Sequence, residues 1–303
     1  MGKKGVKNAG AWMIFFSAAL WGTAGIFVRN MSSSGLHDMQ IVTLRTFFAA
    51  LCIAGIILIK GGTLFRIRLR DLPIFAATGI FSIVLFTFCY YRTMALSTLA
   101  VAAVLLYTAP IFVILISALF FHEKLTPGKC AACVISFIGC ALVSGISGDT
   151  QLSPACIIYG LLTGFGYSLY TIFSNILVRR GYQSLTVTFY TFLFAAAGSM
   201  LIENPVGTFS TAFATPSALL WAIGMAIFNT VIPYFFYTVG LTSVEAGRAP
   251  IIATVEPVVA ALVGIFLFRE PTSVQEILGI VLVLGAILLL QFKVGKNRGK
   301  TSA

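Results

Sequence analysis

Long apolar stretches, separated by short polar connections, run through the whole chain. A hydrocarbon core about 30 Å thick needs roughly 20 apolar residues per helix, and most of these stretches approach that length. A transmembrane barrel would instead show alternating strands of about ten residues. The pattern therefore predicts an all-α membrane protein with ten transmembrane helices. The ten apolar stretches cover residues 11–28, 39–59, 72–94, 98–121, 128–144, 154–178, 184–202, 217–241, 246–268 and 273–292.

Lys and Arg are distributed unevenly between the two sets of loops that these helices would create. With the N-terminus placed inside, sixteen of the 20 Lys and Arg residues fall in inside segments. Three fall outside (Arg29, Arg92 and Arg269), and Arg45 lies within a span. Because positively charged loops stay in the cytoplasm, both termini are predicted to be cytoplasmic. The same distribution explains the net charge of +11, so we expect no nucleic-acid partner.

Composition agrees with a membrane protein. The chain is 59% hydrophobic and 10% charged, whereas a soluble domain is about half apolar and a quarter charged. The six Cys residues fall in or beside apolar runs and are interpreted as small packing residues. Cys130 and Cys133 have the spacing of a redox or zinc pair, but no second pair accompanies them. We therefore expect neither a metal site nor a cofactor.

The second half of the chain repeats features of the first. Pro110 precedes Glu123 by 13 residues, and Pro257 precedes Glu270 by the same 13 residues, at an offset of 147. Each pair brackets an apolar run that ends in Phe. Five spans in each copy is an odd number, so the second copy inserts upside down relative to the first, as in many secondary transporters. We therefore predict two inverted-topology five-helix repeats. They comprise residues 1–147 and 148–303.

Four stretches of the chain carry a family resemblance: "WGTAGIFVR" (21–29), "LRTFFAAL" (44–51), "ALSTLAVAAVLLYTAPIFVILISALFFHEKL" (95–125) and "VEPVVAALVGIFLFRE" (255–270). They resemble the EamA-type transporters of the drug/metabolite transporter superfamily. The resemblance covers nearly the whole chain and implies ten helices, a central cavity and transport of small metabolites, often outward. It leaves the substrate open, because the family spans amino acids, sugars, nucleotide derivatives and drugs. One departure is that Ala109 precedes the proline of the first copy where Glu256 precedes that of the second.

Two charged residues lie well inside predicted spans. An ionised side chain at the bilayer centre costs about 2.5–3.5 kcal/mol on insertion scales, so each should face a wet cavity or a partner. Glu256 lies about nine residues into its span, roughly 13 Å deep at 1.5 Å per residue. It could bind a substrate amine, carry a proton or tie two helices together. Arg45 could bind a carboxylate or phosphate, or act as a fixed counter-charge.

The remaining candidates are aromatic or amide side chains inside spans. A buried Tyr or Trp needs a polar partner for its OH or NH group, and a bound substrate can supply one. The alternatives are interfacial aromatic belts and hydrogen bonds between helices. Trp21 and Tyr167 occupy corresponding places in the two copies. The predicted substrate-binding set is Trp21, Arg45, Tyr90, Tyr107, Tyr167, Tyr170, Asn229 and Glu256.

Pro110 and Pro257 lie at equivalent positions in the two copies. Each removes a backbone hydrogen bond in mid-helix and should bend its span. We predict that they act as hinges for alternating access, with static kinks that shape the cavity as the alternative.

These features predict a transporter and not an enzyme. A membrane-embedded transferase, the remote alternative, needs acid, base or metal-binding groups near one membrane face, and the two His residues fall on opposite sides. We expect an exporter of amino acids or related metabolites in a bacterial inner membrane. An uptake carrier or antiporter for sugars or nucleotide derivatives is the alternative. The expected partners are a small-molecule substrate, protons as a candidate coupling ion, and the lipid bilayer. A monomer is compatible with the sequence, which leaves the oligomeric state open.

Overall fold

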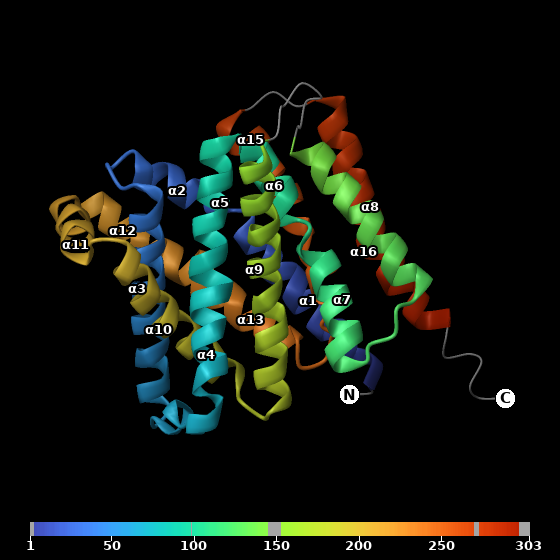
Figure 1. The fold of residues 1–303 in the computed structure, drawn as a ribbon, viewed down its shortest axis with the longest axis horizontal. Helices are drawn as coiled ribbons and strands as arrows, with labels where there is room; N and C mark the ends of the chain where they lie inside the picture. The colour runs from blue at the N-terminus through green and yellow to red at the C-terminus, as the bar shows by residue number, and fades with distance from the viewer. Residues whose placement is uncertain (1–2, 98, 145–152, 270–272, 297–303) are drawn as a thin grey trace.

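The computed structural model describes residues 3–97, 99–144, 153–269 and 273–296 of the 303-residue chain, and these residues form helices without any β-strand (Figure 1). The first half contains α1 (Lys3–Trp21), α2 (Ala24–Ser32), α3 (Asp38–Ile59), η1 (Thr63–Phe65), η2 (Leu69–Asp71), α4 (Leu72–Gly79), η3 (Ile80–Val84), α5 (Leu85–Leu96), α6 (Leu99–Leu106), α7 (Ala109–Phe121) and α8 (Pro127–Val143). The second half contains α9 (Pro154–Arg179), α10 (Ser184–Ile202), α11 (Pro205–Ala214), α12 (Pro216–Gly224), η4 (Met225–Val231), α13 (Ile232–Gly240), α14 (Ala249–Ala253), α15 (Val255–Phe268) and α16 (Val274–Lys296).

These helices combine into ten apolar spans across the described part of the chain. Eight continuous or nearly continuous helical stretches are at least 18 residues long and apolar enough to cross a membrane. Two shorter apolar helices, Pro127–Val143 and Val274–Leu289, take the fifth and tenth places. At 1.5 Å per residue, the 17 residues of α8 reach about 25 Å, close to the thickness of the hydrocarbon core. The predicted fold class is confirmed.

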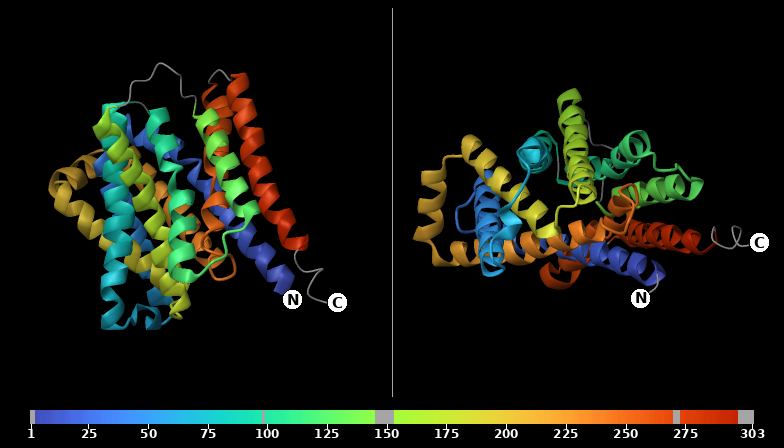
Figure 2. Two further views of the ribbon diagram at one scale, coloured as in Figure 1. Left: turned by 45° about the vertical axis from the view of Figure 1, so that its right-hand side comes forward. Right: turned by 90° about the horizontal axis from the view of Figure 1, so that it is seen from below.

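The helix pairs reflect the inverted repeat. α3 packs on α10 and α8 packs on α16, so equivalent helices of the two halves meet each other. α1 packs on α13 and α5 packs on α9, and exchanging the halves converts one of these pairs into the other. The first residues of α1 and the last of α16 lie at the same end of the bundle, here called the terminal end (Figures 1 and 2). Helices of one half therefore pack against helices of the other half along the whole bundle.

Local backbone irregularities also recur at the offset of 147. The third span contains the π-helical turn η3, and the eighth contains η4; they end at Val84 and Val231. His122 and Arg269, which follow α7 and α15, both adopt a left-handed conformation with φ of 53° and 55°. Such conformations are uncommon for non-glycine residues, so their repetition shows that the two halves share backbone detail as well as span number.

Three spans that the sequence predicts as continuous are interrupted. The first breaks between Trp21 and Ala24, the fourth between α6 and α7, and the ninth at Thr254 between α14 and α15. Pro110 is the second residue of α7 and Pro257 is the third residue of α15. Each proline thus lies in the first turn of a new helix, where its missing N–H costs little. The expectation of a proline in mid-helix is wrong in this detail.

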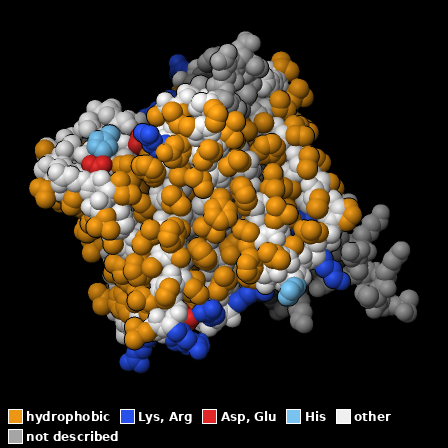
Figure 3. Space-filling model, in the orientation of Figure 1, with side chains coloured by type: hydrophobic (Ala, Val, Ile, Leu, Met, Phe, Trp, Pro, Cys, Tyr) orange, Lys and Arg blue, Asp and Glu red, His pale blue; other side chains and the backbone are white. Residues whose placement is uncertain are grey.

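The outer surface of the bundle is suited to lipid. Orange apolar side chains cover the visible face, and Lys and Arg side chains gather along the terminal end (Figure 3). Large apolar residues such as Leu119, Phe120 and Phe266 are exposed. A contiguous exposed apolar surface of this kind marks contact with a membrane in place of water. Polar side chains within the spans, such as Thr46, Ser174 and Asn229, are buried inside the bundle.

Candidate functional site

The first span is interrupted close to the centre of the bundle. The amide of Asn229, in η4, donates to the carbonyl oxygens of Leu20 (2.6 Å) and Trp21 (3.4 Å). Carbonyl groups at a helix end lack regular helical donors, and each unpaired backbone group in a membrane costs several kcal/mol. Asn229 therefore stabilises the end of α1. Asn229 belongs to the predicted binding set, but its amide N–H groups already donate to backbone carbonyl groups of the protein.

Five aromatic side chains, here called the aromatic cluster, surround this break: Trp21, Tyr167, Tyr170, Tyr234 and Tyr237. The ring centroid of Trp21 lies 4.9 Å from that of Tyr234, 5.3 Å from Tyr237 and 6.4 Å from Tyr167. Tyr170 lies 4.9 Å from Tyr234, edge to face. These distances fall within the 4.5–7 Å range of favourable aromatic pairs. The cluster joins α1 of the first half to α9 and α13 of the second.

Two tyrosine hydroxyls of the aromatic cluster are held by threonines. The hydroxyl of Tyr170 lies 2.8 Å from that of Thr238, and the hydroxyl of Tyr237 lies 2.8 Å from that of Thr171. The indole Nε1 of Trp21 differs, because it is buried without a hydrogen-bond partner among the described residues. A buried N–H without an acceptor costs about 1–3 kcal/mol. Trp21 thus offers a free donor to a molecule bound in the centre.

Glu256 approaches the same region from the start of α15. It is the second residue of that helix and is half-buried, so the positive end of the helix dipole favours its carboxylate. Glu256 forms no hydrogen bond or ion pair of its side chain with any described residue.

A close backbone contact brings Glu256 to the break in the first span. A Cβ atom built on Gly22 would lie 2.6 Å from the carbonyl oxygen of Glu256 and 2.7 Å from the Cβ atom of Val259. Real side chains essentially never show such distances. Only glycine therefore lets the end of α1 pack against the first turn of α15. This packing places Trp21 and Glu256 on two elements that touch.

Arg45 enters from α3 on another side of the site. It is half-buried, and its Nε atom has no acceptor among the described residues. Arg45 and Glu256 do not form an ion pair with each other. A carboxyl group on α15 and a guanidinium group on α3 thus lie inside spans without pairing to each other.

The structure brings Trp21, Tyr167, Tyr170 and Asn229 together around the break in the first span, whereas Tyr90 lies on α5 and Tyr107 follows α6. Tyr234 and Tyr237 are not in the predicted binding set of eight, although they belong to the class of Tyr side chains inside spans from which that set is drawn. Their spacing of three residues, which places both on one face of α13, is the sequence signal that could have found them.

The terminal end of the bundle is closed by charged contacts between the two halves. The carboxylate of Glu123, after α7, accepts hydrogen bonds from the backbone N–H groups of Ala246 (3.0 Å) and Gly247 (3.1 Å). Lys129 Nζ lies 3.2 Å from Glu123 and 3.1 Å from Glu245. The side chains of Glu123 and Lys129 are 7% and 5% exposed, so these charges are largely desolvated. We call this set of contacts the terminal closure.

A cation–π pair accompanies the terminal closure and recurs at the opposite end. The guanidinium of Arg179 lies 4.6 Å from the ring centroid of Phe121, and that of Arg29 lies 3.9 Å from Phe268. Phe121 and Phe268 are equivalent at the offset of 147. We call the pair of Arg29 and Phe268 the distal closure. The same type of contact thus joins the halves at both ends of the bundle.

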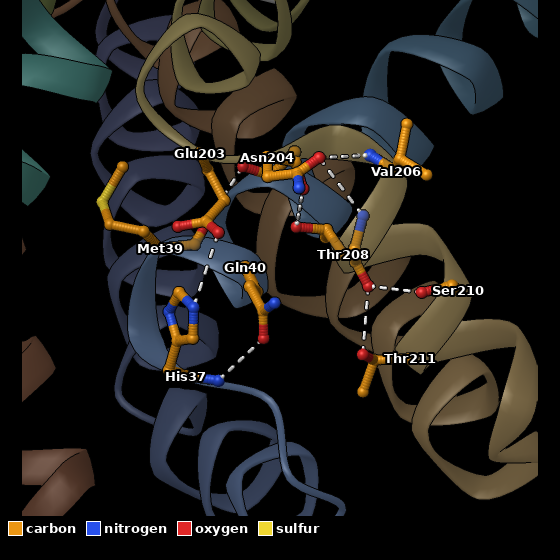
Figure 4. A network of polar contacts seen from close by, with 11 residues as sticks. His37, Met39, Gln40, Glu203, Asn204, Val206, Thr208, Ser210 and Thr211 are labelled. Atoms are coloured by element: carbon orange, nitrogen blue, oxygen red, sulfur yellow. Dashed lines mark hydrogen bonds and ion pairs between the residues drawn. The ribbon is translucent and has the colours of Figure 1, made fainter.

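A further polar cluster lies at the distal end, outside the centre (Figure 4). His37 Nε2 lies 3.5 Å from Glu203 Oε1, and the backbone N–H of His37 donates to Gln40 Oε1 at 3.2 Å. Asn204 Oδ1 accepts from the backbone N–H groups of Val206 and Gly207 and so caps α11. The contact between His37 and Glu203 joins the start of α3 to the end of α10, directly before α11. The described part of the chain contains no group of three or more His, Cys, Asp or Glu residues positioned to hold a metal.

The arrangement of two broken-helix repeats around a buried polar centre agrees with the comparison to known families. The EamA-like transporter family matches residues 8–145 and, a second time, residues 154–292. The chain therefore belongs to the EamA-like transporter family. This confirms the resemblance noted in the sequence and the expectation of a transporter in place of an enzyme.

Individual relatives extend this picture. An uncharacterized transporter of Archaeoglobus fulgidus is 29% identical over 91% of this chain and 94% of its own length. A probable terminal-alkyne amino-acid exporter of Streptantibioticus cattleyicolor is 22% identical over 95% of both chains. A protein of known crystal structure superposes with a TM-score of 0.81 at 17% identity, covering 97% of this chain and 99% of its own. That structure supports the fold alone, whereas the relatives define a membrane transporter.

Proposed function

We propose that this transporter exports amino acids or closely related zwitterionic metabolites by alternating access. The observation that carries the proposal is that Glu256, on α15, and Arg45, on α3, lie inside spans without pairing to each other, and that Nε of Arg45 has no acceptor among the described residues. A molecule with an ammonium and a carboxylate group would satisfy both charges at once. Buried charges without partners are costly in a membrane and therefore point to a ligand or transport pathway.

The aromatic cluster suits the remainder of such a substrate. Aromatic faces attract ammonium groups by cation–π contacts worth about 0.5–2 kcal/mol, and they also accept apolar side chains. The free Nε1 donor of Trp21 adds a hydrogen bond to a substrate oxygen. The name of the Streptantibioticus cattleyicolor relative, a probable exporter of an amino acid with an alkyne, is compatible with a substrate of this kind.

The two closures support a mechanism in which the central site opens to one side at a time. Inverted repeats exchange conformations when a transporter turns from one face to the other. The terminal closure and the distal closure contain equivalent Phe residues. The contacts at one end can therefore open while those at the other end stay closed. We further propose that Glu256 takes up a proton when it releases the substrate ammonium, which would couple transport to protons.

Location in a bacterial plasma membrane with cytoplasmic termini forms part of the same proposal. Lys and Arg residues gather at the terminal end (Figure 3), and positively charged ends of membrane proteins remain in the cytoplasm. In this orientation the terminal closure seals the cytoplasmic side of the site.

The test is a transport assay with purified protein in lipid vesicles. Uptake and efflux of radiolabelled amino acids, sugars and nucleotide derivatives would be measured with and without a pH gradient. We expect saturable transport of amino acids, stimulated by the gradient. Transport of phosphorylated sugars or nucleotide derivatives alone would replace the proposal with the alternative of an uptake carrier or antiporter, in which Arg45 binds phosphate.

A further inference from the structure

A second candidate site lies at the terminal end, away from the aromatic cluster. A cavity of about 330 Å³ opens between the α3–α4 connection and the α9–α10 connection. This volume lies within the range of about 300–1,000 Å³ that is typical of small-molecule sites. The cavity is lined by Arg66, Ile67, Arg68, Arg180, Gly181 and Tyr182.

The wall of this cavity is rigid because the two halves are pinned there by hydrogen bonds. The buried carboxylate of Asp71 pairs with the guanidinium of Arg180 and accepts a hydrogen bond from the hydroxyl of Tyr182 at 2.7 Å. The backbone N–H of Arg68 donates to the same hydroxyl at 3.0 Å. Burial and the contact with Asp71 raise the pKa of the Tyr182 hydroxyl, so it remains a proton donor to Asp71.

The charges of the cavity are not balanced. Asp71 compensates Arg180, but Arg66 and Arg68 form no ion pair with any described residue, and both are exposed. Exposed and partly buried side chains alternate from residue 65 to residue 68, with Phe65 and Ile67 packed against the bundle and Arg66 and Arg68 exposed. Arg66 and Arg68 consequently share one outward face. Guanidinium groups arranged in this way suit the oxygens of a phosphate group.

Apolar side chains beside the arginines indicate that a phosphate group bound there would belong to a lipid. Ile59, at the end of α3, is 88% exposed, and Leu69, next to Arg68, is 83% exposed. Residues of this type at a membrane boundary contact acyl chains. Basic pockets between helices at the cytoplasmic side of membrane proteins bind lipid head groups. A soluble phosphate ion would use the arginines but leave Ile59 and Leu69 without a role.

We infer that Arg66, Arg68 and the Asp71-anchored Arg180 form a binding site for the head group of one anionic phospholipid. This inference is independent of the transported substrate, because the cavity shares no lining residue with the central site. Binding would join the α3–α4 connection of the first half to the α9–α10 connection of the second through a lipid. It would therefore stabilise the terminal end in the conformation seen here.

The test is native mass spectrometry of the purified full-length protein in a neutral detergent. Phosphatidylglycerol or phosphatidylcholine would be added, and the fraction carrying one bound lipid measured. R66Q/R68Q removes two charges that line the cavity, and K60Q/R70Q removes two charges from the same connection outside the lining. We expect the wild type to prefer phosphatidylglycerol. R66Q/R68Q should weaken this binding by about fivefold for each arginine, whereas K60Q/R70Q should change it by less than about twofold.

Three results would overturn the inference. The first is no preference for phosphatidylglycerol over phosphatidylcholine in the wild type. The second is an equal loss in both double variants, which would show a diffuse attraction between a basic surface and an anionic lipid. The third is complete displacement of the lipid by millimolar inorganic phosphate, which would assign the cavity to a soluble anion. Thermal unfolding of both variants in neutral detergent would verify that they fold alike, as expected for exposed side chains.

Discussion

The first and sixth spans occupy the same place in the two repeats, yet only the first is broken. α1 ends at Trp21 and the chain resumes as α2, whereas α9 runs without interruption from Pro154 to Arg179. The ninth span carries Glu256 before its proline, whereas the fourth has Ala109. By contrast, the π-helical turns, the left-handed residues after α7 and α15, and the closures at the two ends recur in both halves.

This difference separates two classes of feature. The features that recur lie at the ends of spans or shape the backbone, and each is needed twice if the molecule opens first at one face and then at the other. The features that occur once include the break beside Trp21, whose ring packs on Tyr234, and the charged groups of Arg45 and Glu256 inside their spans. A substrate is itself asymmetric, so a site that binds it in one orientation cannot be built from equivalent residues. In the proposed function, the repeat would supply the motion and the departures from it would supply the contacts with the substrate.

The largest effect should come from removing the charge that only the second repeat has. Glu256→Gln keeps the size and hydrogen-bonding capacity of the side chain and should fold normally. It loses a charged hydrogen bond to the substrate, worth about 1.5–3 kcal/mol, so transport should fall by about tenfold or more. Its dependence on pH should also disappear, because no group remains at this position to exchange a proton. Initial rates in vesicles over a range of pH would measure both effects.

The conservative variant Glu256→Asp provides the control for that experiment. It retains the charge on a shorter side chain and should keep pH-dependent transport at a reduced rate. Wild-type rates and wild-type pH dependence in Glu256→Gln would mean that the carboxylate only ties helices together, and the asymmetry of the centre would then be structural.

Variants at the two closures test the features that recur in both halves. Phe121→Leu and Phe268→Leu each remove one aromatic face from an arginine, a contact worth about 0.5–2 kcal/mol. We expect Phe121→Leu to speed hydrogen exchange of residues 244–249, in the terminal closure, by about two- to tenfold. Phe268→Leu should speed exchange of residues 26–33, in the distal closure, and leave residues 244–249 unchanged. Each variant is the control for the other, and identical exchange patterns in both would show that the two ends do not open separately.

The sequence allowed the span number, the inverted repeat and the family to be predicted, because hydropathy and the spacing of Pro110 and Glu123 report on environment and period. It did not allow the helix breaks to be predicted. An apolar run describes what surrounds a segment and says nothing about whether its backbone is continuous. The end of α1 depends on Asn229, more than 200 residues away, and on the close contact of Gly22 with α15. Such contacts exist only in the folded protein.

Trp21 offers a smaller and more specific test. Its Nε1 atom has no partner among the described residues, so Trp21→Phe should not lower the thermal stability through a lost protein hydrogen bond. If the N–H group serves the substrate, the apparent KM should rise by about two- to tenfold, as expected for one hydrogen bond of 0.5–1.5 kcal/mol. Trp12→Phe, at a position that is 64% exposed, is the matched control and should change neither quantity. A loss of stability without a change in KM would mean that Trp21 supports the fold and does not contact the substrate.

The prolines should give the smallest effect, since they follow the helix breaks instead of creating them. Pro110 and Pro257 lie in the first turns of α7 and α15, where a restored N–H group finds no helical acceptor four residues earlier in the same segment. Pro→Ala at either position therefore adds no strong hydrogen bond, but it frees a backbone angle that proline fixes. We expect the turnover number to fall by less than about threefold in each variant, with unchanged substrate affinity, because a looser first turn makes the break a poorer hinge. Turnover and binding measured on the same preparations decide the point. A fall in affinity without a fall in turnover would show that the prolines shape the binding site and do not act as hinges. A large effect in only one variant would show that this proline belongs with the features that occur once and form the site, and not with the features that recur.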